Sequence, residues 1–153
     1  MRHIVSVAIF AVVGSMTFAG HAKAQSQSHS ITLDVRNFSS GGDDGYTDVR
    51  ASNGTTYSYK YSGGSGKGGD VTFHVGTPAT VVVHVQSDPR YTIDNVSFTG
   101  DVNHQLSYPN PSAGTTATIQ DTNTVAQQAE YKVVIKDSTA NATVPCDPKI
   151  INN

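Results

Sequence analysis

The sequence is poor in the residues that would support disulfides or long helices. It contains no tryptophan, one cysteine and two methionines, and its only glutamate is Glu130, beside eleven aspartates. A single cysteine excludes a disulfide within the chain. Few glutamates and many aspartates disfavour helix, because glutamate suits helix interiors whereas aspartate suits turns. The absence of tryptophan also weakens the case for a carbohydrate-binding surface.

Long apolar runs are also missing, apart from one at the start of the chain. Residues 4–19 are mostly apolar, with Arg2 before them and Ala22-Lys23-Ala24 after them. This layout predicts a secretory signal peptide over residues 1–24 and a mature chain of residues 25–153 in the bacterial periplasm or medium. No cysteine follows the run to carry a lipid, so we expect no stable membrane anchor.

The expected mature chain is short and acidic. Without Arg2 and Lys23, eight basic and twelve acidic side chains remain, a net charge of −4. An acidic chain without basic clusters argues against nucleic acid as a partner. Residues 25–153 are of the length of one domain, and we see no internal repeat.

Alternation of apolar and polar residues is the dominant pattern of the mature chain. It predicts short strands rather than helices, since alternate residues of a strand face opposite sides. The runs centre on Ile31–Val35, Val71–Val75, Val81–Val85, Tyr91–Phe98, Thr116–Ile119 and Tyr131–Ile135. Turn-forming residues separate them. We therefore predict an all-β fold, an antiparallel β-sandwich of seven to nine short strands, immunoglobulin-like in architecture.

Asn53-Gly54 is the strongest local signal, because this pair favours a two-residue type I′ hairpin turn. With Ser52 and Thr55 flanking the turn, residue 50 would pair with 57, 48 with 59, and 46 with 61. Six side chains would then share one face: Tyr46, Asp48, Arg50, Tyr57, Tyr59 and Tyr61. A slip of one residue would redistribute them.

This six-residue face is the candidate ligand-binding site. Tyrosine rings with a stacked arginine suit a protein or glycan partner. The alternative interpretation is that the rings form one wall of the core, which is where aromatic residues of sandwiches usually lie.

Other chemistry-bearing residues are interpreted as structural. The acidic stretch 41–48 brings carboxylates together as calcium requires, but its spacing does not match an EF-hand loop, and we interpret it as a solvated turn. A tight turn after Val75 would place His84 opposite Asp70 and His74 opposite Thr80, which assembles no two-histidine metal site. No G-x-S-x-G motif occurs. Cys146 has only Lys149 nearby to favour a thiolate, so we expect it to be structural. We therefore predict no catalytic residue, metal or cofactor.

The C-terminus carries one resemblance to a known family. An alternating strand, Tyr131–Asp137, is followed by a closing Asp-Pro-x-Ile-x-Asn at Asp147, Pro148, Ile150 and Asn152. This arrangement resembles the small bacterial β-sandwich domains of the DP-EP family, although no Glu-Pro pair is present. The resemblance implies an immunoglobulin-like fold and no established activity. Pro145 and Pro148 also indicate an edge strand, because proline cannot donate to a ladder.

Three functions remain open on the sequence. The first is an exported, non-enzymatic domain that binds or assembles with a partner, a homo-oligomer included. The second is a small periplasmic hydrolase or metal-binding protein whose site is assembled from loops. The third is a subunit of a surface structure, in which the Ile31–Val35 strand pairs with a neighbouring chain.

Overall fold

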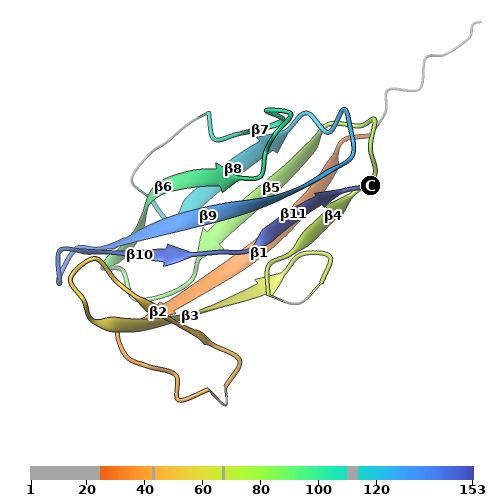
Figure 1. Cartoon of the computed structure of the whole chain (residues 1–153). Helices are drawn as coiled ribbons and strands as arrows, with labels where there is room; N and C mark the ends of the chain where they lie inside the picture. Colours follow the sequence, from red (N-terminus) through yellow and green to blue (C-terminus); the bar gives the residue numbers. More distant parts are fainter. Residues whose placement is uncertain (1–24, 43, 67, 110–113) are drawn as a thin grey trace, which may run out of the picture.

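The computed structural model describes residues 25–153 except 43, 67 and 110–113, and the expected signal peptide over 1–24 lies outside the described residues. Figure 1 shows two layers of strands packed face to face. The prediction of an all-β sandwich is confirmed. No helix in the described residues is long and apolar enough to cross a membrane.

Six strands form the first sheet, in the order β2-β3-β1-β5-β8-β7. They are β1 (Gln27–Arg36), β2 (Thr47–Arg50), β3 (Thr56–Gly63), β5 (Ala79–Val85), β7 (Leu106–Ser107) and β8 (Thr116–Asp121). The second sheet has the order β10-β9-β11-β4, with β6 along the other side of β9. Its strands are β4 (Val71–Phe73), β6 (Tyr91–Thr99), β9 (Gln127–Asp137), β10 (Ala142–Cys146) and β11 (Lys149–Asn152).

The sheets differ from the expected arrangement in two respects. Both are mixed, because β1 pairs parallel with β5 and β11 pairs parallel with β4. The described residues also form eleven strands rather than seven to nine. One of the additional strands, β7, is only two residues long and too short to show an alternation. The immunoglobulin-like topology stays a prediction.

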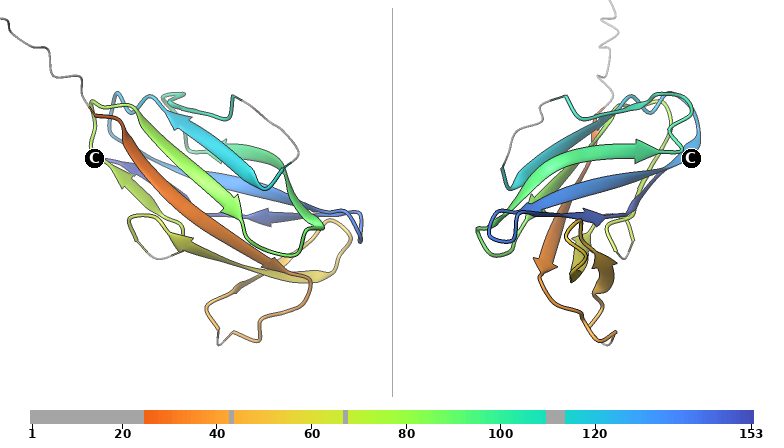
Figure 2. Two further views of the ribbon diagram at one scale, coloured as in Figure 1. Left: turned by 180° about the vertical axis from the view of Figure 1, so that it is seen from behind. Right: turned by 60° about the vertical axis from the view of Figure 1, so that its left-hand side comes forward.

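The core lies between the sheets and is filled by alternate residues of each strand. Ile31 and Leu33 of β1 are fully buried, as are Val133 and Ile135 of β9. Figure 2 shows the two layers from two further directions, with β9 running along most of the length of its sheet. The alternation seen in the sequence therefore marks the buried face correctly on the long strands.

Strand β1 is central in its sheet, with β3 on one side and β5 on the other. The hypothesis that Ile31–Val35 pairs with a neighbouring chain is wrong in this fold, because both of its edges are already occupied. Alternation shows which residues of a strand are buried, whereas the position of the strand within the sheet depends on distant partners.

Candidate functional site

The β2–β3 hairpin has a register one residue away from the expected one. Ala51 N–H donates to the Thr55 carbonyl at 3.0 Å, which leaves a three-residue loop, and Gly54 has a φ of 82°. Val49 consequently lies opposite Tyr57, and Asp48 opposite Ser58. A three-residue loop needs only one residue with positive φ, and glycine supplies it.

The six candidate residues therefore divide between two faces, and the single face expected from the sequence is wrong. Tyr57, Tyr59 and Tyr61 point into the sandwich and are 1%, 8% and 6% exposed. Asp48 and Arg50 are exposed and alternate with Val49, which shares the tyrosine face. The slip has a physical reason: it places Val49 and Ala51, rather than two charged residues, beside the buried rings.

The three buried tyrosines connect the two sheets through their hydroxyls. Tyr57 donates to Oδ2 of Asp137 at 2.9 Å, and Tyr61 donates to the Cys146 carbonyl at 3.1 Å. Tyr59 accepts the backbone N–H of Asp147 at 3.3 Å. Burial is the main cause that raises the pKa of Tyr57, to about 12, and the bond to Asp137 adds to it. These tyrosines form a wall of the core and stabilise the contact between the sheets.

Tyr46 lies on the outer face of the first sheet, in the loop of residues 37–46. The Arg36 guanidinium is 3.5 Å from its ring centroid, and its hydroxyl donates to Asp34. Burial and then this hydrogen bond raise the pKa of Tyr46. Lys60 Nζ donates to the Asp44 carbonyl at 3.0 Å. These contacts fasten the loop across β1 and β3.

Two acids of the stretch 41–48 are bonded within this same loop. Asp48 accepts the Ser39 hydroxyl and the Ser40 N–H, and these bonds lower its pKa, the Ser39 bond most. Asp44 pairs with Arg36 at 2.7 Å, whereas Asp43 lies outside the described residues. The described acids of this stretch hold the loop in place.

Asp147 and Pro148 separate β10 from β11 without shifting the register on β9. Cys146 pairs with Val133 and Lys149 with Glu130, and the Tyr131 N–H donates to the Pro148 carbonyl at 3.1 Å. β10 is at the edge of its sheet, as Pro145 indicated. Ser52 covers part of that edge through bonds to Thr143.

Cys146 is fully buried, and burial raises the pKa of its thiol well above the usual value, with the charge of Asp147 adding to the effect. We expect the native protein to be unreactive towards an aromatic disulfide reagent and to react once it is unfolded in denaturant, because the thiolate is the reactive form. Rapid stoichiometric labelling of the folded protein, followed spectrophotometrically, would contradict this placement.

Hydrogen bonds to β1 show which way the backbone of β3 faces. The Leu33 carbonyl accepts the Gln86 N–H at 2.9 Å, so Leu33 directs its backbone groups towards β5. Its partner on β3 is Tyr61, whose own N–H and carbonyl must then point away from β1. The Gly63 N–H points the same way, since Gly63 pairs with Ile31 two residues before Leu33.

This outward side of β3 is open where β2 ends. The ladder between the two strands stops at the Thr47–Tyr59 pair, and Gly45 has a φ of 77°, which turns the chain away. A cleft of about 410 Å³ lies there, which we call the β3 groove. Its lining residues are Gly45, Thr47, Tyr59, Lys60, Tyr61, Ser62, Gly63, Gly66, Gly68 and Asp147. Four glycines leave room for another backbone to approach.

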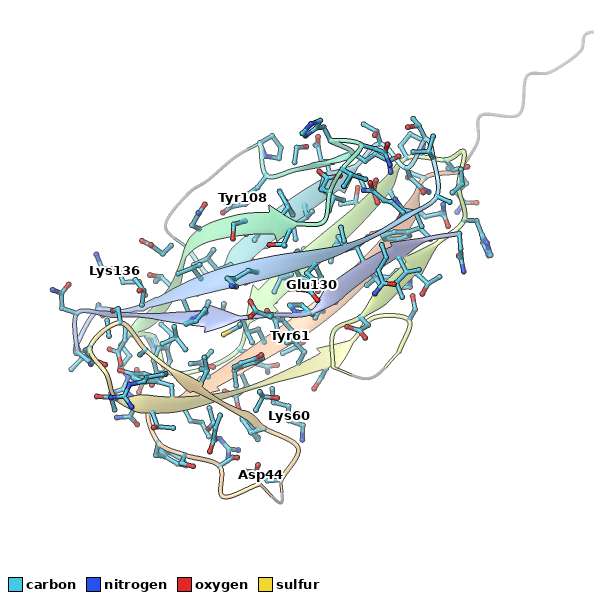
Figure 3. All side chains as sticks on the ribbon, viewed as in Figure 1. Asp44, Lys60, Tyr61, Tyr108, Glu130 and Lys136 are labelled. Atoms are coloured by element: carbon cyan, nitrogen blue, oxygen red, sulfur yellow. The ribbon has the colours of Figure 1, made fainter. Side chains whose placement is uncertain are left out.

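Charged groups border the β3 groove. The Asp147 side chain is 48% exposed and lies 3.5 Å from Lys132 Nζ. Figure 3 shows Lys60 directed away from the core, while the neighbouring Tyr61 lies inside. The groove therefore combines backbone groups of β3 that no described strand pairs with, an aromatic floor and a partly exposed carboxylate. This groove was not predicted from the sequence, because an open edge exists only where one strand extends beyond the end of its neighbour, as β3 extends beyond β2.

A serine of the loop between β3 and β4 lies close to a histidine of β1. Ser65 Oγ is 2.9 Å from Nε2 of His29, a distance at which a histidine can accept a hydroxyl proton. The same oxygen accepts the Thr72 N–H at 2.9 Å, which closes the loop between β3 and β4. The sequence gives no signal for this pair, because 36 positions separate its members.

The other histidines do not lie as the expected turn would place them. β4 and β5 belong to different sheets, so the predicted pairing of His84 with Asp70 is wrong. His84 lies opposite Thr32 and Thr116 instead. The reason is that β4 pairs with the C-terminal strand β11 rather than with the next strand in the chain. In the described part of the chain, no group of three or more His, Cys, Asp or Glu residues is placed to hold a metal.

Comparison with known proteins gives no family. No family model and no curated protein matches this chain. A solved structure, the solution structure of amebosin, is 18% identical over 55% of this chain and 88% of its own, with a TM-score of 0.28. Membership of the DP-EP family stays a prediction.

Proposed function

We propose that this protein is an exported, non-enzymatic binding domain that takes an extended segment of a partner protein into the β3 groove. The observation that supports this proposal most is the open edge, with the backbone groups of Tyr61 and the N–H of Gly63 directed into a lined cleft. An unpaired strand edge is complementary to another extended main chain, which supplies the missing donors and acceptors. This chemistry favours a polypeptide over a glycan.

The test blocks the groove and uses a displayed library of random peptides as the probe. Thr47 is exposed and lines the groove, so Thr47→Trp should fill it. The matched control is Thr118→Trp, an exposed position on β8, which lies three strands away from β3 in the same sheet. Peptides selected on the wild type should bind the control variant and lose at least about tenfold in affinity for Thr47→Trp, about 1.4 kcal/mol.

Hydrogen exchange then reports the mode of binding. The amides of Tyr61 and Gly63 should exchange rapidly in the free protein and become protected when a selected peptide binds. Binding that leaves both amides unprotected would refute strand addition at this edge.

A hydrolase is the second candidate, and the Ser65–His29 distance is the observation in its favour. The Thr72 N–H bonded to the same oxygen favours a structural role instead. We therefore expect a fluorophosphonate probe to leave Ser65 unlabelled in the native protein. Labelling of Ser65 that disappears in His29→Ala, with the fold preserved by circular dichroism, would establish the enzyme instead.

A further inference from the structure

A polar cluster is enclosed at the end of the sandwich that carries the C-terminus (Figure 1). It contains Asp121 at the end of β8, Asn123 in the following turn and Asn152 at the end of β11. Their exposed fractions are 2%, 0% and 2%. Most positions between the sheets are apolar, so three enclosed polar side chains at one end require an explanation.

Several polar atoms of this cluster have no hydrogen-bond partner among the described residues. They are Oδ2 of Asp121, Oδ1 of Asn123 and both side-chain atoms of Asn152. The orientation of Asn123 is fixed, because its Nδ2 donates to the carbonyls of His74 and Thr77 at 2.7 and 2.8 Å. Its Oδ1 is therefore an acceptor without a donor.

The three residues are held close to one another. Asp121 Oδ1 accepts the Asn123 N–H at 2.7 Å. The Asn152 side chain lies beside the Asp121 carboxylate without reaching hydrogen-bonding geometry. When Nδ2 of Asn152 faces the carboxylate, Oδ1 of Asn152 stays free as an acceptor. The cluster then offers three oxygen acceptors: Oδ2 of Asp121, Oδ1 of Asn123 and Oδ1 of Asn152.

The Asp121 carboxylate also lacks an opposite charge. None of the ion pairs among the described residues includes it. Burial is the main cause that raises its pKa, and the charge of Asp101 acts in the same direction. Buried charges in proteins are usually paired or bound to a metal. A cation would compensate this charge and satisfy the neighbouring amide oxygens together.

We propose that Asp121, Asn123 and Asn152 bind a calcium ion. Calcium prefers six to eight oxygen ligands, accepts carboxylates and amide carbonyls, and tolerates irregular geometry. Asp121 also lines a cleft of about 470 Å³, together with Pro78, Ser107 and Thr124. This cleft gives an entry path and room for waters to complete the coordination. The site is separate from the β3 groove and does not depend on the function proposed for it.

Thermal unfolding in calcium chloride tests the proposal on the mature protein. With a single carboxylate, we expect a dissociation constant of about 0.1–1 mM, the range of extracellular calcium modules. The Tm should rise progressively as calcium increases from about 0.1 to 10 mM, and magnesium should raise it less, because magnesium gives up its waters reluctantly. Excess chelator should reverse the rise.

Two variants assign the effect to this cluster. Asp121→Asn keeps the shape of the side chain and should lose the calcium-dependent rise. Asn152→Ala removes a side chain whose two polar atoms have no hydrogen-bond partner of good geometry among the described residues, so it should fold, and it should lose most of the rise. Asp94→Asn is the control, an exposed acid that changes the net charge equally and should keep the rise.

Three results would overturn the proposal. A Tm independent of calcium would show that water alone satisfies the cluster. A calcium-independent Tm whose dependence on pH weakens in Asp121→Asn would show that Asp121 is protonated instead. A calcium response retained in both Asp121→Asn and Asn152→Ala would place the ion elsewhere, for example among the acids of residues 41–48.

Discussion

Replacement of Tyr59 by alanine should lower the free energy of unfolding by about 3–5 kcal/mol, the range for a buried aromatic side chain cut back to alanine. The ring is 8% exposed and packs edge-on against Tyr61, with the centroids 5.8 Å apart. The change would leave a cavity between the sheets and remove the acceptor of the Asp147 N–H. Denaturant or thermal unfolding measures the loss.

Tyr46→Ala is the matched control, because it removes the same ring from the outer face of the same sheet. We expect it to lose about 1 kcal/mol, since it breaks the contacts of Arg36 and Lys60 with the ring and one hydrogen bond near solvent. Should Tyr59→Ala lose less than about 1 kcal/mol, the buried wall described above would be wrong, and the tyrosine face would again be a candidate binding surface.

Asp137→Asn should also destabilise the fold by about 3–5 kcal/mol, the range for removing one partner of a buried ion pair. Asp137 is fully buried, and its carboxylate accepts bonds from the Tyr57 hydroxyl and from the N–H groups of Thr139 and Ala140. Arg90 Nε lies 3.6 Å away, but the Arg90 side chain as a whole is 24% exposed, so the three donors should account for most of the loss. An amide would direct N–H groups at some of these donors.

Low pH should also show how much the Asp137 carboxylate contributes to stability. Burial opposes its ionisation, but the bonds from Ala140, Tyr57 and Thr139 and the charge of Arg90 outweigh burial and lower its pKa. A lowered folded pKa gives stability that is present above the unfolded value of about 3.9 and is lost as pH falls through the folded pKa. Urea unfolding between about pH 5 and 2 should show this loss in the wild type.

Asp137→Asn should show a weaker dependence on pH over the same range, while the exposed control Asp94→Asn should change stability by less than about 0.5 kcal/mol. Equal acid sensitivity in the wild type and in Asp137→Asn would contradict the assigned role.

The candidate site was predictable only in part, and the hairpin shows why. Asn53-Gly54 marked the turn correctly, and the tyrosines of β3 were correctly placed on one face. The facing strand was misplaced by one residue, because the preference of this pair for a two-residue turn is outweighed by the packing of Val49 and the buried Ala51 against the core. A local turn preference contributes about 1 kcal/mol to the free energy of folding. Placing two apolar side chains, rather than two charged ones, against the core contributes more than that.

The sequence by itself determined the strand class, the alternating buried residues and the position of Pro145 at a sheet edge. These properties follow from side-chain period and backbone chemistry, which act within a few residues. The tertiary structure alone decided that β1 is central, that β4 pairs with β11, and that Tyr61 and Gly63 face an open groove. It also brought Asp121 and Asn152 together from different sheets. Which strands pair depends on the packing of the whole core. The local sequence of a strand therefore does not show which partner it will have.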